Sequence, residues 1–350
     1  MSLVFPPDVD VAIVAHNARG TVPATLDSLW RAHCPPSQVT IVDVASTDGT
    51  AECVRATWPE IRQIRLNENL GPSPGRNQGI LQSRQPFVFL MDADVMVEPG
   101  TVQVLKAAMD ADPRIAIGSP VVVHADRPDV IQYAGTGLHF ICEAVNPWLD
   151  RPLAERGHEP LNIGVASTCG LLIHRQRALE YGLFDERYFI GKEDGDFTHR
   201  AVLAGYQIRE LPQARVLHRS HPRGTWLFYY QIRNRWHFML KNYEVRTLVF
   251  LAPTLLVHET LQAVLLVLKG HGWTYLKAVA GLIAMLPALP ADRARVRRIR
   301  AQHDAAVLRS DPMVMREDLA GSPLLRRAKT LYERLLTAYW RLLVRTVLPR

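Results

Sequence analysis

The sequence of 350 residues lacks the motifs of several common nucleotide-binding classes. No G-x-G-x-x-G follows the first apolar run and no G-x-x-x-x-G-K-[ST] occurs, which disfavours a dinucleotide-dependent oxidoreductase and a P-loop phosphotransferase. Only four cysteines are present and none forms a C-x-x-C pair, so we interpret them as reduced and structural, as in a cytoplasmic protein. Residues 1–9 lack a basic region followed by an apolar stretch, so we expect no signal peptide and a site that stays in the cytosol.

The composition is typical of a folded protein whose charge is unevenly distributed. Hydrophobic residues make up 48% and charged residues 21% of the chain, and the length suits one large domain with an appendage, or two domains. The net charge is +7, and much of the excess lies late, beginning with five arginines at residues 293–300. Because neither interleaved aromatic residues nor a recognisable module accompanies them, nucleic acid is disfavoured as a partner. A membrane surface is the better candidate, since the basic stretch follows the most apolar part of the chain.

Apolar runs alternate with helical patterns over the first hundred residues. The runs at residues 11–15, 39–42, 61–66 and 87–91 are typical of strands, and apolar residues at helical spacing fill the intervals. A loop rich in glycine and proline, continuing to Gly75, is expected to lead into a helix that carries Arg76. Strands separated by helices predict right-handed crossovers and an α/β fold with a mostly parallel central sheet, covered by helices on both faces.

Carboxylates follow two of these predicted strands. Asp43 comes after the second, and Asp92 and Asp94 come after the fourth. The carboxyl ends of parallel strands meet at the edge where open α/β sheets bind ligands. Two carboxylates at this spacing can hold Mg²⁺ or Mn²⁺ against the phosphate oxygens of a substrate. Plainer alternatives stay open: Asp92 can cap a strand-ending turn, and Asp43 either contacts a ribose or base or orders the turn that contains Ser46.

Seven motifs occur in order over roughly the first 240 residues. They are VAHN at residues 14–17, VDVASTDGT at 42–50, NLG at 69–71 with GRNQGI at 75–80, LMDAD at 90–94, GLFDE at 182–186, EDGDF at 193–197 and YYQIRN at 229–234. In this order they resemble the inverting nucleotide-sugar glycosyltransferases of family 2, of the rhamnosyltransferase-like bacterial type, whose fold is GT-A. One departure is Val44-Ala45, where the family commonly has Asn-Gly, and it removes a side-chain amide from the donor loop.

The resemblance implies a donor site and a divalent cation. It assigns donor binding to Ala15, His16, Asn17, Asp43, Arg76, Asp92, Ala93 and Asp94. The implied cofactor is Mg²⁺ or Mn²⁺, with Asp94, Asp92 and His218 as the metal ligands; on chemical grounds the cation stabilises charge on the leaving diphosphate. A helix-surface position for Arg76 and a structural role for His218 are the alternatives.

Three acids, Glu193, Asp194 and Asp196, open a later predicted helix. Acids are favoured at a helix N-terminus in any case, but three exceed what capping needs. The resemblance assigns Asp194 as the general base of an inverting displacement, with Glu193 as its substitute. Asp196 either orders the loop or binds the acceptor, and Gly170 is placed on the acceptor side. The irregular stretch at residues 135–169 suits a lid that faces the acceptor, or a plain surface loop.

The last third of the chain is strongly apolar. Residues 247–268 contain one charged residue, Glu259, and an early proline, Pro253, that is expected to interrupt the helix. Residues 273–289 form a second apolar run. Both approach the length of a membrane span, but their polar residues and prolines favour interfacial or re-entrant helices, with a buried hairpin as the alternative. The final predicted helix is amphipathic and suits a lipid surface or a dimer face.

These observations predict a GT-A domain at residues 1–240 and a helical membrane-associating or oligomerisation region at residues 241–350. The expected enzyme is an inverting, metal-dependent glycosyltransferase at the cytoplasmic face of the cell membrane, peripheral or re-entrant, with a homodimer as an option. Its expected partners are a UDP-, dTDP- or GDP-sugar donor and a glycan or glycolipid acceptor, such as a lipid-linked or cell-surface polysaccharide. The sugar would be a hexose or deoxyhexose.

Two other classes of protein are weighed against this prediction. A nucleotidyltransferase is also metal-dependent and α/β, but it usually presents a phosphate loop rich in glycine and basic residues after the first strand, where this chain has HNARG at residues 16–20. A catalytically silent membrane scaffold with a GT-A fold is the other alternative. The intact acids Asp92, Asp94 and Asp194 argue against silence.

Overall fold

The computed structural model describes residues 4–220, 224–313 and 323–348, and the chain divides into two compact units. The first unit comprises Met1–Gly135, Trp148–Ala201 and Tyr206–Pro222. The second comprises Thr136–Pro147, Val202–Gly205 and Arg223–Arg350. The functional boundary predicted between residues 240 and 241 stays a prediction.

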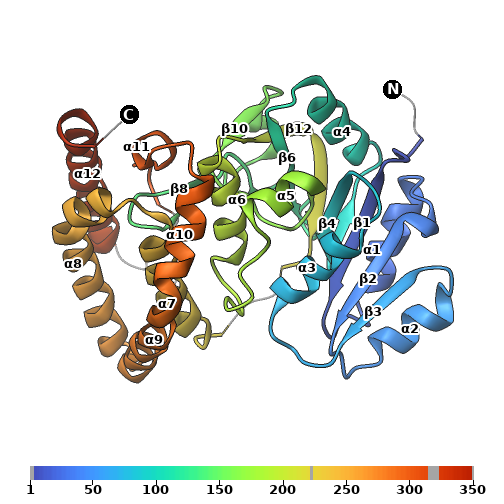
Figure 1. The fold of residues 1–350 in the computed structure, drawn as a ribbon, viewed down its shortest axis with the longest axis horizontal. Coiled ribbons are helices and arrows are strands. Elements are labelled where there is room, and N and C mark those ends of the chain that lie inside the picture. Colours follow the sequence, from blue (N-terminus) through green and yellow to red (C-terminus); the bar gives the residue numbers. More distant parts are fainter. Residues whose placement is uncertain (1–3, 221–223, 314–322, 349–350) are drawn as a thin grey trace. The chain divides into compact units, whose positions relative to one another are not determined.

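A ten-stranded mixed sheet forms the centre of the first unit, with its main strands in the order β10-β12-β6-β11-β4-β1-β2-β3 (Figure 1). The strands are β1 (Val9–Ala15), β2 (Val39–Val44), β3 (Arg62–Leu66), β4 (Phe87–Asp92), β5 (Val95–Val97), β6 (Ile115–His124), β7 (Ile131–Tyr133), β10 (Leu161–Ile163), β11 (Leu171–His174) and β12 (Gln207–His218). Strands β4, β1, β2 and β3 run parallel, as do β6 and β12, whereas β11 lies antiparallel between β4 and β6. The predicted α/β fold is confirmed, with a central sheet that is mixed.

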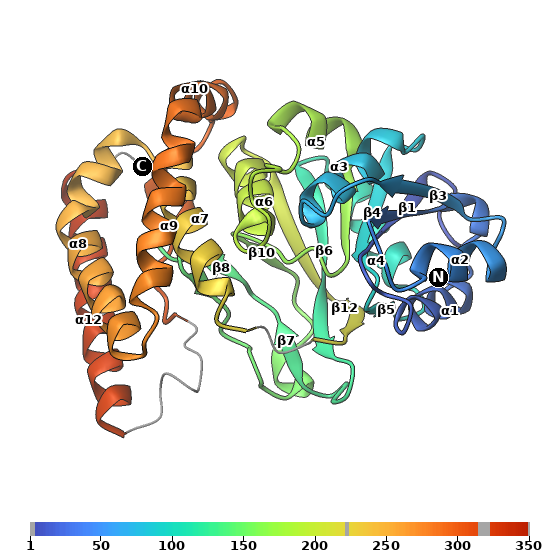
Figure 2. The same ribbon diagram turned by 90° about the horizontal axis from the view of Figure 1, so that it is seen from below.

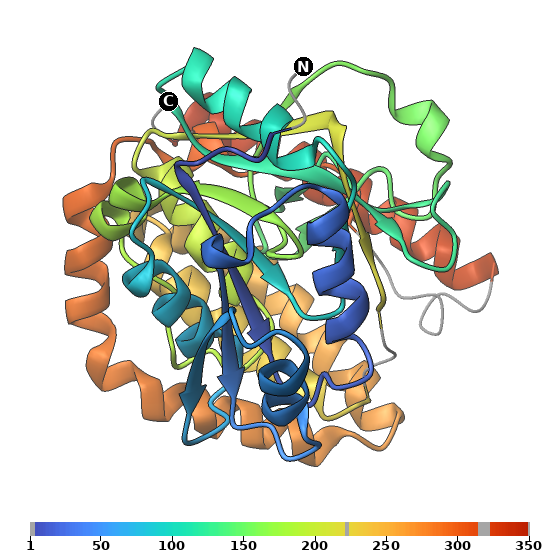
Figure 3. The ribbon, with the colours of Figure 1, turned by 90° about the vertical axis from the view of Figure 1, so that its right-hand side faces the viewer.

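Helices cover both faces of this sheet. They are α1 (Val22–Arg31), α2 (Thr50–Thr57), α3 (Pro72–Gln82), α4 (Thr101–Ala111), α5 (Arg175–Tyr181) and α6 (Glu193–Leu203). Figure 2 shows α3, α5 and α6 on one side and α1 and α4 on the other, and in Figure 3 α1 and α3 flank the blue strands from opposite sides. The alternation of β1 explains this arrangement, because Val11 and Ile13 pack in the core with Leu26 of α1 while Ala12 faces α3.

Helix α3 lies unusually close to the sheet because of its glycines. A Cβ on Gly79 would lie 2.6 Å from the Cβ of Ala12, and a Cβ on Gly75 would lie 2.9 Å from a methyl of Val14. The helix begins at Pro72, so the prediction that the loop continues to Gly75 is wrong. Proline is accepted in a first helical turn because its missing N–H would have no intrahelical partner there.

Helices make up most of the second unit, with short elements in its remaining parts. The helices are α7 (Leu227–Asn242), α8 (Val245–Leu268), α9 (Gly272–Met285), α10 (Leu289–Ile299), α11 (Asp304–Val307) and α12 (Pro323–Thr346). The short strands are β8 (Gly137–Leu138) and β9 (Ala144–Val145). Within the described residues the chain also has the 3₁₀ turns η1 (Pro36–Gln38), η2 (Leu153–Arg156) and η3 (Leu286–Ala288). Helix α12 is joined to the hairpin β8-β9 by a stack of Trp340 on Phe140, whose ring centres are 4.9 Å apart.

Two helical segments of this unit are long and apolar enough to cross a membrane by length and composition, Val245–Leu268 and Gly272–Ile299. Only 17% and 6% of their most apolar windows are buried, so they do not form the buried hairpin considered as an alternative. Pro253 lies inside α8, which continues past it, so the predicted interruption is wrong. The exposed apolar side chains include Leu256, Leu261 and Leu268 of α8 and Trp273 of α9.

Candidate active site

The predicted donor residues lie at the carboxyl edge of the parallel strands. In the register of the sheet Ala15 pairs with Asp43, and Val14 pairs with Asp92. His16, which follows β1, therefore lies at the same edge as Asp43 near the end of β2 and Asp92 at the end of β4. Ala93, 4% exposed, is held there by its backbone, whose N–H donates to the carbonyl of Val14 over 3.1 Å.

The loops after β1 and β2 are tied together by hydrogen bonds. Asn17 adopts a left-handed φ of 49°, its N–H donates to Ser46 Oγ over 2.9 Å, and its side-chain oxygen accepts the N–H of Thr47 over 2.9 Å. His16 is exposed and anchored through Nδ1, which lies 2.6 Å from the carbonyl oxygen of Val44. The side-chain amide nitrogen of Asn69 lies 3.0 Å from His16 Nε2. Protein contacts thus order this edge, which reduces the entropy cost of binding a donor.

Asp43 is nearly buried and orders its own turn. Its side chain is 3% exposed, Oδ1 accepts the N–H of Ser46 over 3.1 Å, and Oδ2 lies 3.6 Å from Arg65 Nε. Among the described residues no hydrogen bond reaches Oδ2. Asp43 therefore fills the turn-ordering role and keeps one oxygen able to accept a hydrogen bond.

Asp94 carries an unsatisfied carboxylate oxygen. Its Oδ1 is buried and has no hydrogen-bond partner among the described residues, while Oδ2 lies 3.7 Å from His218 Nε2. Strand pairing brings these two residues together, because β5 follows Asp94 and pairs Val95 with His218 of β12. A buried carboxylate oxygen without a partner is costly, so this atom suits a cation. Asp94 therefore suits a divalent ion, and His218 lies where it could join as a ligand after losing its ring proton.

The third predicted metal ligand, Asp92, has a different partner. Arg76 Nη2 donates to both of its oxygens, over 3.0 and 3.3 Å. Within residues 4–220, 224–313 and 323–348 no group of three histidine, cysteine or acidic side chains is arranged to hold a metal ion. Metal binding by Asp92 stays a prediction.

The imidazole of His218 lies in a strongly polar environment. Burial lowers the pKa of this group, but the nearby Cys169 sulfur and the Asp94 carboxylate outweigh burial and raise it to about 11. On its other side, His218 Nδ1 lies 2.8 Å from the side-chain oxygen of Gln132. A contact of this kind fixes the ring orientation of a histidine ligand.

Arg76 is buried and bridges the two acid clusters. Its side chain is 4% exposed and holds Asp92 through Nη2, while Nη1 donates to Asp194 Oδ1 over 2.8 Å and lies 3.6 Å from Glu193 Oε1. The surface-helix alternative for Arg76 is therefore excluded. Burial opposes the charge of the guanidinium, but Asp194, Asp92 and Glu193 together raise its pKa. Desolvation, followed by the neighbouring acids Asp94 and Asp194, raises the pKa of Asp92 against the opposing effect of Arg76.

Asp194 lies in the first turn of α6 and is held on two sides. Oδ1 accepts from Arg76 and from the hydroxyl of Thr168, both over 2.8 Å, and Oδ2 accepts the Thr168 N–H over 3.2 Å. Its side chain is 27% exposed, whereas that of Glu193 is 8% exposed. Of the two acids considered for general base, Asp194 is the more accessible.

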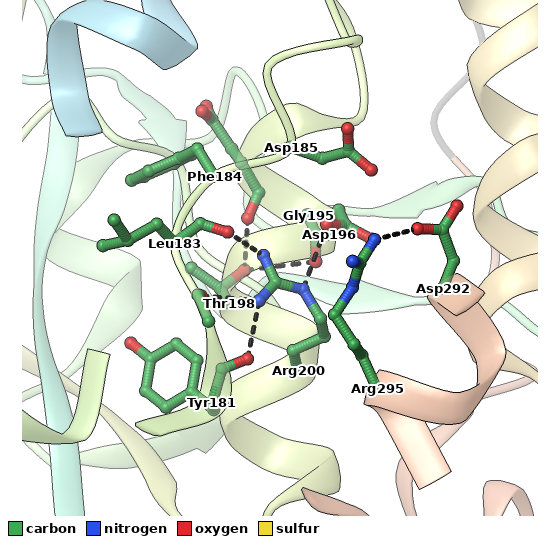
Figure 4. Close-up of polar contacts among 12 residues, drawn as sticks. Tyr181, Leu183, Phe184, Asp185, Gly195, Asp196, Thr198, Arg200, Asp292 and Arg295 are labelled. Carbon is green, nitrogen blue, oxygen red and sulfur yellow. Dashed lines mark hydrogen bonds and ion pairs between the residues drawn. The ribbon is translucent and has the colours of Figure 1, made fainter. Parts of the chain in front are cut away.

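Asp196 and Gly170 are buried in the protein interior. Asp196 is 0% exposed and pairs with Arg200 over 3.1 Å, and Arg200 donates in turn to the carbonyls of Tyr181 and Leu183 (Figure 4). This geometry favours the loop-ordering role of Asp196 over contact with an acceptor. A Cβ on Gly170 would lie 3.1 Å from Val216 and 3.3 Å from the ring of Phe89, so Gly170 is required for close packing.

Three contributors to the site were missed by sequence reasoning. Thr168 and Cys169 precede β11 without any motif that marks them, and their contacts to Asp194 and His218 depend on tertiary structure. Asn77 is next to Arg76, and its side chain donates to the carbonyl of Phe184 over 3.0 Å and accepts the Phe184 N–H over 2.9 Å. For Asn77, the only signal in the sequence was its position beside Arg76 in the motif GRNQGI at residues 75–80.

Comparisons with known proteins identify the family of the chain. The glycosyl transferase family 2 model matches residues 10–175. The chain is 31% identical over 222 residues, 57% of this chain and 72% of the relative, to the N-acetylglucosaminyl-diphospho-decaprenol L-rhamnosyltransferase of Mycobacterium tuberculosis. The chain belongs to glycosyltransferase family 2. It is therefore a glycosyltransferase, as the motifs predicted.

Solved structures share the fold at low sequence identity. Residues 1–349 of TarS from S. aureus, solved in complex with UDP-GlcNAc, align with a TM-score of 0.54 and 17% identity over 96% of this chain and 92% of TarS. GalNAc-T7, solved with UDP, GalNAc and Mn²⁺, aligns with a TM-score of 0.55 and 16% identity over 68% of this chain. The alignment spans about half the length of GalNAc-T7, 48%.

The buried position of Arg76 predicts a large loss of stability on its removal. We expect Arg76→Met to lower the free energy of unfolding by about 3 kcal/mol or more, because the acids around it lose their buried counter-charge. Arg65→Met is the matched control: Arg65 is half-exposed beside Asp43, so its loss should cost less than about 1 kcal/mol.

Urea denaturation of both variants measures this difference. The deficit of Arg76→Met should shrink as the pH falls, since a protonated Asp92 needs no counter-charge and its pKa is already raised. Equal losses in the two variants would contradict the bridging role of Arg76.

Proposed function

We propose that this chain is an inverting, metal-dependent glycosyltransferase that moves a sugar from a nucleoside-diphosphate donor to a hydroxyl of a lipid-linked or cell-surface polysaccharide acceptor. One observation carries the proposal: a single buried guanidinium joins Asp92, beside the unsatisfied Asp94, to the partly exposed Asp194. A group for the departing diphosphate and a group for the attacking hydroxyl are then neighbours in one network. An inverting displacement needs both.

On the donor side, Asp94 and His218 are the residues that would hold Mg²⁺ or Mn²⁺, with Asp92 as a further ligand or ribose contact. When bound, the cation supplies charge stabilisation for the leaving diphosphate. GalNAc-T7, which shares the fold, was solved with UDP and Mn²⁺, which supports this choice. His16, Asn17 and Asp43 at the sheet edge would contact the nucleoside.

On the acceptor side, Asp194 would take the proton of the attacking hydroxyl. Arg76 holds this carboxylate in place through a charge-assisted hydrogen bond. A base held before the acceptor arrives lowers the entropy cost of reaching the reactive geometry. Glu193 is the substitute base of the proposal.

The exposed apolar helices suggest where the acceptor lies. A long unburied apolar surface on α8 and α9 is unusual for a soluble protein, and the arginines of α10 follow it. We infer that these helices lie in the cytoplasmic face of the cell membrane, at interfacial or re-entrant depth. The relative from M. tuberculosis is named for a decaprenol-linked acceptor, which supports a lipid-linked acceptor here. The homodimer and the 240/241 boundary remain part of the proposal.

The base assignment predicts a selective loss of turnover. Asp194→Asn should lower kcat by roughly 10²- to 10⁴-fold, the usual contribution of a positioned base, and leave donor binding nearly intact. The assay is release of nucleoside diphosphate from UDP-, GDP- and dTDP-sugars, including dTDP-rhamnose, with a short-chain polyprenyl diphosphate-linked N-acetylglucosamine as acceptor. The control is Asp110→Asn, the same chemical change on the surface of α4. Turnover near that of the control would remove Asp194 from this role.

The metal assignment predicts donor binding that depends on Asp94. In thermal-shift measurements with the same donors, Mn²⁺ should enhance the stabilisation by the preferred sugar nucleotide, and chelation should abolish the enhancement. Asp94→Asn should weaken Mn²⁺-dependent donor binding by roughly tenfold or more, as expected for a perturbed metal site, while Asp110→Asn should not. Donor binding of equal strength under exhaustive chelation would overturn the metal dependence.

The membrane assignment predicts binding to vesicles through α8. Leu256→Gln, Leu261→Gln and Leu268→Gln, combined in one variant, should reduce co-flotation with anionic liposomes several-fold, because these exposed side chains would lie in the acyl region. Leu81→Gln with Leu161→Gln is the control, since both leucines are exposed on the other unit. Unchanged flotation of the α8 variant would show that this surface does not contact lipid.

A further inference from the structure

Thr168 contacts both oxygens of the proposed general base. Its hydroxyl donates to Asp194 Oδ1 over 2.8 Å and its backbone N–H donates to Oδ2 over 3.2 Å. Thr168 is 1% exposed, so its hydroxyl is withdrawn from water. A buried hydroxyl aimed at a carboxylate forms a charge-assisted hydrogen bond, which is stronger than one between neutral groups.

The contacts divide the two oxygens of Asp194 into different roles. Oδ1 accepts two donors, the Thr168 hydroxyl and Arg76 Nη1, whereas Oδ2 accepts one, the Thr168 N–H, among the residues that the structure describes. An ionised carboxylate has about four acceptor sites, two on each oxygen. Oδ1 is therefore saturated and Oδ2 retains one site. Because the side chain is 27% exposed, a substrate can reach it.

The segment that carries Thr168 is fixed to the same helical turn as Asp194. Thr198 of α6 donates its hydroxyl to the carbonyl of Asp194 over 2.7 Å, and the same oxygen accepts the N–H of Ala166 over 3.2 Å. Thr198 is completely buried and bonds only to backbone groups in these contacts. The two threonines thus share one network, and only Thr168 contacts the carboxylate.

We propose that Thr168 is a positioning residue for the general base. Its hydroxyl and Arg76 together occupy Oδ1, so that the free site of Oδ2 faces the acceptor hydroxyl. In the transfer the acceptor O–H bond breaks and its proton passes to Oδ2. The oxygen electron pair then forms the bond to the anomeric carbon, while the diphosphate leaves with the electrons of its own C–O bond. This inference rests on the proposed role of Asp194.

The test compares three threonine variants in the nucleoside diphosphate release assay described above, with the donor that the wild type turns over best. Thr168→Val keeps the shape and the backbone N–H but removes the hydroxyl, so kcat should fall about tenfold while KM for the donor stays within about twofold. Thr168→Ser retains the donor and should stay within about threefold of wild-type kcat. Thr101→Val is the matched control, because the Thr101 hydroxyl is also buried but contacts the backbone of Arg215; this variant should lower the melting temperature and leave kcat within about threefold.

The outcomes separate this inference from the proposed function. If Thr168→Val keeps wild-type kcat, or if Thr101→Val lowers kcat equally, Thr168 does not position the base. Asp194→Asn is measured in parallel: near-wild-type turnover of that variant contradicts the base itself, whereas its inactivity beside an active Thr168→Val contradicts only the positioning role. Should Thr168→Val melt far below wild type, Thr168→Ser and the split between kcat and KM still decide the question.

Discussion

The first unit depends on one buried guanidinium. Arg76 is surrounded by Asp92, Glu193 and Asp194, and each of these acids would be costly to bury without it. Several carboxylates gathered around one guanidinium favour the approach of further positive charge. Asp94 Oδ1, which has no hydrogen-bond partner among the described residues, is the atom that such a charge would approach.

The same helix that carries Arg76 fixes the geometry of both sides of the site. Asn77 holds the backbone of Phe184 and also donates to Glu186 Oε1 over 2.8 Å. At the start of the helix, Gly71 has a φ of 88°, and a Cβ there would overlap the carbonyl oxygen of Phe189. Helix α3 thus contacts Asp92 at the edge of the sheet and also the segment of the chain that leads into α6. The glycines of α3 allow the helix to approach the sheet closely, and Arg76 and Asn77 then contact the residues before and within α6. This explains why glycines, arginine and asparagine occur together in this helix.

The acids at the ends of strands could be predicted from sequence. The contacts between side chains of elements far apart in the sequence could not. Asp43, Asp92 and Asp94 were found because each follows an apolar run, and the edge of a parallel sheet collects such positions. The pairing of Arg76 with Asp194 spans 118 positions of the chain. No local pattern encodes that pairing, because it depends on how α6 packs beside α3.

The different roles of the acids in α6 and one error of sequence reasoning have the same origin. The three acids of α6 look equivalent in sequence, yet their side chains have different neighbours once the helix is packed. Asp194 is partly exposed, whereas Asp196 faces inward to Arg200, which holds the backbone before the helix. At α3, proline and glycine suggested a loop, but the close packing of Gly75 and Gly79 on the strands outweighs their low helix propensity.

The polar residues of the apolar helices gain a different meaning from their partners. Glu259, the single charge in residues 247–268, pairs with the buried Arg235 of α7 and accepts the hydroxyl of Tyr275 of α9 over 2.9 Å. Its charge is therefore satisfied inside the helical unit, and the outward face of α8 is left to leucine and valine. Judged from composition alone, the charge of Glu259 argues against membrane contact, but its side chain contacts Arg235 and Tyr275 and does not face outward. Yet α9 packs at Gly281 against Tyr229 and Arg233 of α7, a helix that also carries Asn234 and His237. Helices α8 and α9 are therefore covered on one side by the polar helix α7 and exposed on the other. This arrangement suits the surface of a membrane better than the interior of a membrane.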